Sequence, residues 1–158
     1  MEAIKSLVKK DGVVTTTPCN KLLGAEFVFN TYTGNFSTHI DVSEFKVLHA
    51  ILEKHHKELN KICNKIAGII LTQNLDMNDY LEEFVSGTSI FKNENLFCGK
   101  KYSVLEFIEA HKIIIALIRN EIISAISLEK DLSLNDFMQK LITSHEKMIC
   151  DLESVAEK

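Results

Sequence analysis

The stretch FKVLHAILEKHHKELNKICNKIAGII, residues 45–70, decides the fold. Its apolar residues recur at steps of three and four, the spacing that gathers side chains along one side of an α-helix. Charged residues fill the positions between them and mark the solvated side: Lys54, Lys57, Glu58, Lys61 and Lys65. Because Asp41 or Ser43 can cap its start, the pattern predicts a single helix over 43–72. That length is typical of a helix in a bundle.

Two other helices are marked by residues that favour helix starts. Thr17 can cap a helix over 17–38, and the proline after it loses no needed hydrogen bond at the first helical position. Ser103 and Glu106 have the spacing of a capping box, in which each side chain binds the other residue's backbone N–H. The apolar stripe that follows predicts a helix ending near residue 128.

The remaining segments complete the predicted architecture. A fourth helix begins near Ser133. In the long connection between the second and third helices, residues 76–84 predict a short amphipathic helix, and residues 86–99 read as a loop. We therefore expect an all-α, ferritin-like four-helix bundle over 17–158 with a short helix in its long crossover, preceded by a flexible tail over 1–16.

Composition limits the class of protein. The chain has 158 residues, enough for one domain with a sizeable core. Its hydrophobic content of 46% excludes a wholly disordered chain, and one proline with six glycines excludes collagen and low-complexity linkers. The 18 basic and 22 acidic residues give a net charge of −4, which argues against a strongly basic nucleic-acid binder.

The cysteines and the longest apolar run bear on the compartment. Cys19, Cys63, Cys98 and Cys150 show neither the spacing of a zinc knuckle nor that of a small disulfide framework. This usage favours reduced thiols in a cytoplasmic protein. The longest apolar run, residues 113–118, is far shorter than a membrane span, so we expect no membrane partner.

Several stretches resemble a known family. Residues 35–38 read NFST at the end of the first helix, and residues 43–49 read SEFKVLH at the start of the second. In the Dps family, the ferritin-like DNA-protection proteins of starved bacteria, the corresponding segments read NFHWNV and F-x-x-x-H. Residues 144–150, SHEKMIC, are similar to the family's HEK-x-x-W pattern, and residues 80–84 resemble its crossover helix. The resemblance covers residues 22–152.

The resemblance implies a dodecamer, a cage of twelve copies that takes in iron, oxidises it between subunits and stores the oxide. Each family site takes two histidines from one subunit and an Asp and a Glu from its partner. His49 matches one histidine, and Glu53, one turn later, can serve as an outer ligand. The other three positions have lost their usual ligands: Ser37, Asn64 and Gly68. Because Fe(II) needs several donors and charge neutralisation, we expect weak iron binding and weak or lost ferroxidase activity.

Other histidines are open to two interpretations. His39, two residues beyond the replaced ligand, and His56, on the same side of the helix as His49 and Glu53, are possible substitute ligands. The alternative for His39 is an ordinary surface or interface histidine. His55, next to His56, is expected to be partly solvated.

His111 and His145 lie on apolar stripes and are expected to be core or interface histidines with a hydrogen-bond partner. A metal site inside one subunit would need histidines and acids on several helices, and no such set is evident in the sequence. An alternative function is therefore a non-catalytic structural or interaction protein that keeps the ferritin-like assembly.

Two groups of charges complete the expectations. Lys5, Lys9 and Lys10 near the N-terminus could contact DNA, because lysine-rich tails hold DNA in some Dps proteins and a cage repeats them. Asp131 and Asp136 precede or begin the fourth helix. They are interpreted either as acids that line a pore or as residues favoured at a helix N-terminus by the backbone dipole.

Overall fold

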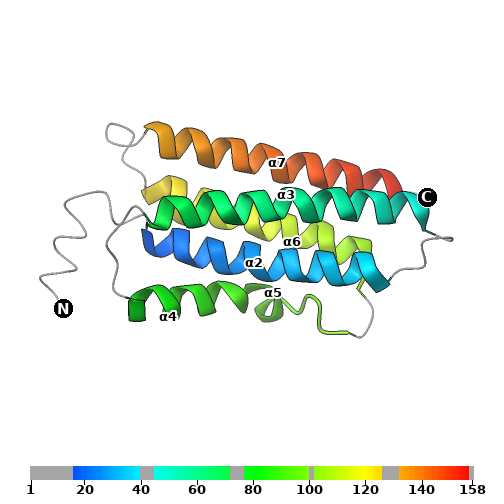
Figure 1. Cartoon of the computed structure of the whole chain (residues 1–158), viewed down its shortest axis with the longest axis horizontal. Coiled ribbons are helices and arrows are strands. Elements are labelled where there is room, and N and C mark those ends of the chain that lie inside the picture. Colours follow the sequence, from blue (N-terminus) through cyan, green and yellow to red (C-terminus); the bar gives the residue numbers. More distant parts are fainter. Residues whose placement is uncertain (1–15, 40–44, 72–76, 100–101, 126–131, 157–158) are drawn as a thin grey trace, which may run out of the picture.

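The computed structural model describes residues 16–39, 45–71, 77–99, 102–125 and 132–156. Four long helices lie side by side along a common direction (Figure 1): α2 (Thr16–His39), α3 (Lys46–Leu71), α6 (Val104–Leu117) and α7 (Leu132–Ala156). The part of the chain that the structure describes contains no strand, so the all-α prediction is confirmed. None of its helices has both the length and the apolar character that a bilayer crossing needs.

The connectivity is that of a ferritin-like bundle. Helices α2 and α3 run in opposite directions, as do α6 and α7, whereas α3 and α6 run in the same direction (Figure 1). A connection between two parallel helices must return along the bundle, and this one contains α4 (Met77–Thr88) and α5 (Ile90–Asn93). Both lie outside the bundle beside α2, as the predicted short helix in the crossover requires.

The apolar stripe of α3 faces the core as its spacing predicts. Its buried residues are Leu48, Leu52, His55, Leu59, Ile62, Ile66 and Ile70. Removing such side chains from water supplies most of the favourable free energy of folding. Ile51 and Ile69, which lie beside this stripe, are only half-buried against the core.

One predicted boundary is wrong, and one predicted helix changes its hydrogen-bond pattern before its predicted end near residue 128, which lies outside the described residues. The predicted helix over 103–128 is α-helical only as far as Leu117, then continues as a π-helical turn (Ile118–Ile122) and a 3-10 turn (Ile123–Ala125). The spacing of apolar residues does not reveal a change from α-helical to π-helical or 3-10 hydrogen bonding. The predicted loop over 86–99 is also partly helical, because α4 extends to Thr88 and α5 follows at once.

The capping box at the start of α6 is confirmed, and its glutamate has a second partner. The Glu106 backbone N–H donates to Ser103 Oγ at 3.2 Å, and the Ser103 N–H donates to Glu106 Oε2 at 2.9 Å. Glu106 Oε1 also accepts from the Phe97 N–H at 3.2 Å. Phe97 is buried with a left-handed φ of 59°, packed against Tyr32 and Phe107. One carboxylate therefore fixes both the helix start and the loop before it.

Helices α2 and α4 touch backbone to backbone. A Cβ added at Gly24 would overlap the carbonyl oxygen of Phe84, and one added at Gly87 would overlap that of Lys21. Glycine is therefore required at both positions, since any other residue would push the helices apart. Gly68 differs, because a Cβ there would meet nothing within 4 Å.

We predict that Gly87→Ala lowers the free energy of unfolding by about 1–3 kcal/mol, because overpacking displaces α4 from α2. Gly68→Ala is the matched control and should raise it by up to about 1 kcal/mol, since alanine favours an open helix interior. Urea unfolding followed by circular dichroism measures both. Equal effects of the two substitutions would contradict the close contact between α2 and α4.

Candidate functional site

Each of the four long helices contributes one glutamate or histidine to the interior. These are Glu26 from α2, His55 from α3, His111 from α6 and His145 from α7, and none of them is more than 2% exposed. Helix periodicity turns each of these positions toward the bundle axis together with its apolar neighbours. Burying such groups is costly unless they find polar partners, so their contacts decide whether the bundle is stable.

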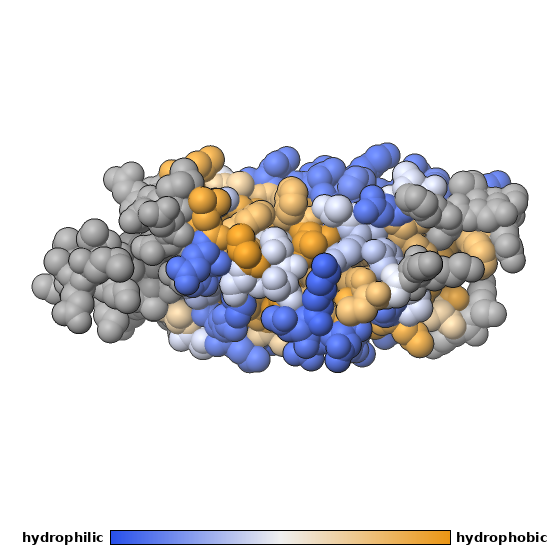
Figure 2. All heavy atoms as spheres, turned by 90° about the horizontal axis from the view of Figure 1, so that it is seen from below, coloured by the Kyte–Doolittle hydropathy of each residue, from blue (hydrophilic) through white to orange (hydrophobic). Residues whose placement is uncertain are grey.

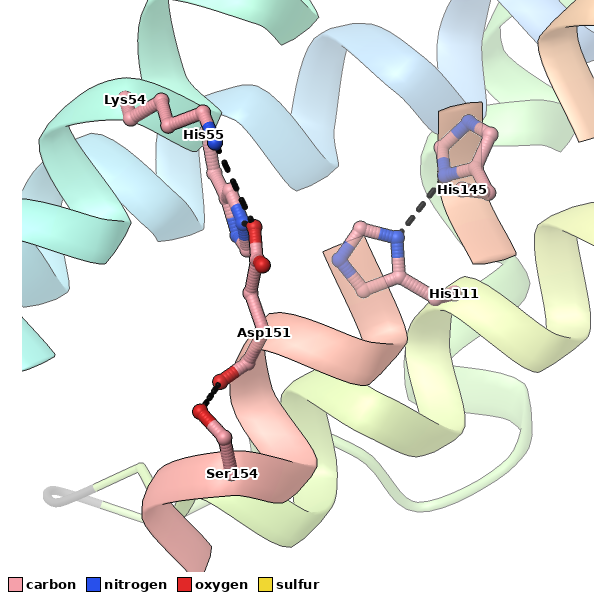
Figure 3. Close-up of polar contacts among 6 residues, drawn as sticks. All are labelled: Lys54, His55, His111, His145, Asp151 and Ser154. Carbon is pink, nitrogen blue, oxygen red and sulfur yellow. Dashed lines mark hydrogen bonds and ion pairs between the residues drawn. The ribbon is translucent and has the colours of Figure 1, made fainter. Parts of the chain in front are cut away.

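Glu26 and two histidines form a chain of hydrogen bonds. His145 Nε2 lies 2.6 Å from Glu26 Oε1, and His145 Nδ1 lies 2.8 Å from His111 Nδ1. Figure 3 shows the rings of His111 and His145 directed at one another from α6 and α7. The chain is complete when His145 Nε2–H donates to Glu26 Oε1 and one hydrogen lies between the two Nδ1 atoms. The expected hydrogen-bond partners of both histidines are thus present.

The charge state of His111 is set by its surroundings. Burial lowers the pKa of His111 well below its usual value, and the neighbouring His145 and His55 lower it further. Its ring also meets the Phe29 ring edge-on at 4.6 Å between centroids. His111 is therefore neutral at ordinary pH.

His55 connects the interior to the surface. Its Nε2 lies 3.0 Å from Asp151 Oδ2, and Lys54 Nζ lies 3.8 Å from the same oxygen (Figure 3). Burial lowers the pKa of His55, and the hydrogen bond to Asp151 partly offsets that effect. The expectation that His55 is partly solvated is wrong, because the neighbouring helices cover it. Its ring stands edge-on to His111, with 6.1 Å between centroids.

Polar groups continue along the side of α2 that faces α3. The Asn30 side-chain amide donates to Asn60 Oδ1, and His56 Nδ1–H donates to the Asn30 carbonyl at 3.2 Å. Among the described atoms, Glu26 Oε2 and Asn30 Oδ1 are buried without a hydrogen-bond partner. Burial, and then the charge of Glu26, raise the pKa of Cys63 to about 12. Cys63 therefore stays a neutral thiol.

Sequence reasoning overlooked Glu26. The available signal was an acidic residue at an apolar-spaced position of the first helix, together with two histidines on the apolar stripes of the third and fourth. The four interior groups do not converge on one point, however. No three His, Cys, Asp or Glu residues of the described segments lie close enough together to share a metal ion. The chemistry of the cluster is proton sharing within one chain.

The residues of the predicted metal site lie elsewhere, on α3 and at the end of α2. Glu53 is exposed and His49 is half-buried, and their spacing places them on one side of α3. Asn64 and Gly68 are exposed farther along the same helix, and Ser37 is buried on α2.

The other predicted site residues are partly outside the described residues. His56 is half-buried against α2, where a Cβ at Gly34 would meet its ring. Asp136 is exposed and pairs with Lys140 one turn later, at 3.0 Å. The side chain of His39 is not among those described, and the same holds for four further residues: Asp131, Lys5, Lys9 and Lys10.

The chain matches the model of a known protein family. The family model of the ferritin-like domain matches residues 19–158, which includes all four long helices except the first residues of α2. No curated protein matches the chain.

We predict that Glu26→Ala lowers the free energy of unfolding by about 1–3 kcal/mol, because it leaves the buried N–H of His145 without its acceptor. Glu26→Gln keeps the size and one hydrogen bond of the side chain and should cost less than half as much. Urea unfolding at neutral pH compares the two variants. Similar losses would show that the hydrogen bond to His145 contributes little.

The raised pKa of Cys63 predicts that this thiol resists alkylation. At pH 8, a pKa of about 12 leaves on the order of one thiolate in ten thousand, and the thiolate is the reactive form. Iodoacetamide should label the exposed Cys98 and Cys150 first, as followed by peptide mass spectrometry. Because the Glu26 charge contributes to the shift, Glu26→Gln should speed labelling of Cys63. Labelling of wild-type Cys63 as fast as Cys98 would contradict the assignment.

Proposed function

Since the chain belongs to the family of ferritin-like domains, we propose that it is a Dps-like subunit whose ferroxidase centre is weak or lost. Ferritin-like domains generally bind iron and form homo-oligomers. The proposal assigns this chain to the iron-storage and DNA- or peroxide-protection class, as a cage of twelve copies. Iron is its cargo, and the oxidation step is what has been weakened.

The main support for this proposal comes from the side chains on the exposed side of α3. In the resemblance to Dps, the acids that each subunit contributes across the interface correspond to Asn64 and Gly68. Both positions are exposed, and the space where a Gly68 side chain would begin is open. There is therefore room for a carboxylate side chain at position 68. His49 and Glu53 alone offer an imidazole and a carboxylate, fewer donors than Fe(II) requires.

The described residues of the bundle interior offer no replacement centre. A di-iron site inside a ferritin-like bundle takes a Glu from each of two helices and a Glu-x-x-His pair from each of the other two. Glu26 is the one buried acid among the described residues, and one of its oxygens already pairs with His145. This donor set does not fit a di-iron centre, which supports the proposal that oxidation is slow.

An apolar surface on α2 and α4 supports assembly with further copies. Phe27 of α2 is 54% exposed, and its ring lies 5.7 Å from that of Phe84 on α4. Leu81 and Val85, one turn apart on α4, are exposed beside it. Figure 2 views this side of the molecule and shows apolar surface between charged residues. Exposed apolar clusters of this kind are typical of protein interfaces.

We predict that light scattering after size-exclusion chromatography gives a mass many times that of one chain, with twelve copies as the expected number. The same protein, loaded anaerobically with Fe(II) and then given peroxide, should form oxide slowly, as followed by absorbance. A monomer would contradict the cage. Assembly without any iron uptake would favour the non-catalytic structural alternative.

Restoring the acids tests why oxidation is slow. The double variant Asn64→Asp, Gly68→Glu should speed oxide formation about tenfold or more, since ligand changes typically alter metal sites by 10–100-fold. The matched control is Gly68→Gln, which has the size of glutamate without its charge. Fast oxidation by the wild type would contradict the proposal, and His49→Ala with Glu53→Ala would then test whether the centre lies there. DNA binding through Lys5, Lys9 and Lys10 is a separate proposal, tested by removing residues 1–10.

A further inference from the structure

The contact between His111 and His145 joins two helices through one proton. The two Nδ1 atoms lie 2.8 Å apart, and both side chains are at most 1% exposed. A hydrogen bond between two ring nitrogens exists only while one of them carries hydrogen and the other does not. With both nitrogens protonated, two N–H groups would point at one another inside the bundle. The space between the two Nδ1 atoms therefore holds one hydrogen but not two.

The surroundings can compensate only one positive charge. From α2, Glu26 Oε1 lies 2.6 Å from His145 Nε2, and Phe29 covers the His111 ring. From α3, His55 stands against the His111 ring, and Cys63 lies near Glu26. His55 is in turn bonded to Asp151 of α7, a half-exposed acid that also lies near Lys54 of α3.

Among the described residues, therefore, Glu26 is the one acid in direct contact with the pair. The carboxylate of Glu26 can compensate the positive charge of one imidazolium at His145. No second acid of the described segments is in contact to compensate an imidazolium at His111. Burial lowers the pKa of His111, so the second proton binds only at acidic pH.

We propose that the His111–His145 contact is an acid-sensitive latch between α6 and α7. When the second ring takes up a proton, the hydrogen bond is lost and the two N–H groups repel. Helix α7 then separates locally from α6, while the contact between α2 and α4, which is made by glycines and contains no histidine, stays closed. The inference does not depend on the proposed iron chemistry.

Hydrogen–deuterium exchange of the full-length assembled protein tests the latch. Exchange is compared at pH 7.5 and pH 5.0, with times scaled for the intrinsic pH dependence of amide exchange. Peptides around His111 and His145 should exchange about tenfold faster at the acidic pH, and peptides of α4 should not, because opening is local. Unchanged protection, or equal acceleration in every helix, would overturn the proposal.

A non-titrating variant supplies the control. In His111→Gln, the side-chain amide can still donate to His145 Nδ1 but cannot take up a second proton. The acid-induced acceleration around residue 145 should be abolished in this variant. His56→Gln, which replaces a histidine outside the pair, should keep it. If His111→Gln is unfolded at pH 7.5, His145→Gln replaces it. Retention of the full acid response in a folded variant would overturn the proposal.

Discussion

Burying the Glu26 carboxylate inside the bundle creates a requirement on which the rest of the interior depends. A charged oxygen away from water must have a hydrogen-bond donor, and the nearest one is supplied by His145 of α7. The other ring nitrogen of His145 lies within hydrogen-bond distance of His111 Nδ1 on α6, so the two rings are joined by one hydrogen. One carboxylate thus fixes the positions of three helices relative to one another.

Carboxylates are few in the described interior, and the proposed function assumes the same shortage at the exposed side of α3. Ferritin-like centres hold iron with carboxylates, which neutralise the charge of the metal. The described interior holds a single buried acid, and the proposal places the neutral residues Asn64 and Gly68 where the family has acids. Histidines are present in both places, and those of the interior bond to one another or to single carboxylates. Under the proposed function, the fold has therefore kept histidines and exchanged most of the carboxylates.

The crossover is held by a different kind of contact. Gly24 and Gly87 let the backbones of α2 and α4 approach closely, and this brings Phe84 against Phe27. The exposed apolar residues of both helices then form one surface. Because α2 and α4 approach closely at these glycines, the exposed apolar residues that we propose support assembly lie together on one surface.

The sequence by itself determined the helices and their starts. Apolar spacing located α3 and α7 to within a few residues, and the Ser103–Glu106 box located the start of α6, because both signals depend on residues no more than a few positions apart. The same spacing placed His111 and His145 among the core positions.

Only the tertiary structure decided what those core residues meet. Glu26 and His145 are 119 positions apart, and no local pattern relates them. The hydrogen bond between His55 and Asp151 was equally out of reach, since the two residues lie on different helices, and the π-helical turn after Leu117 leaves no trace in the apolar spacing. Helical periodicity is a property of a few neighbouring residues, whereas partners for buried polar groups exist only once four helices have packed.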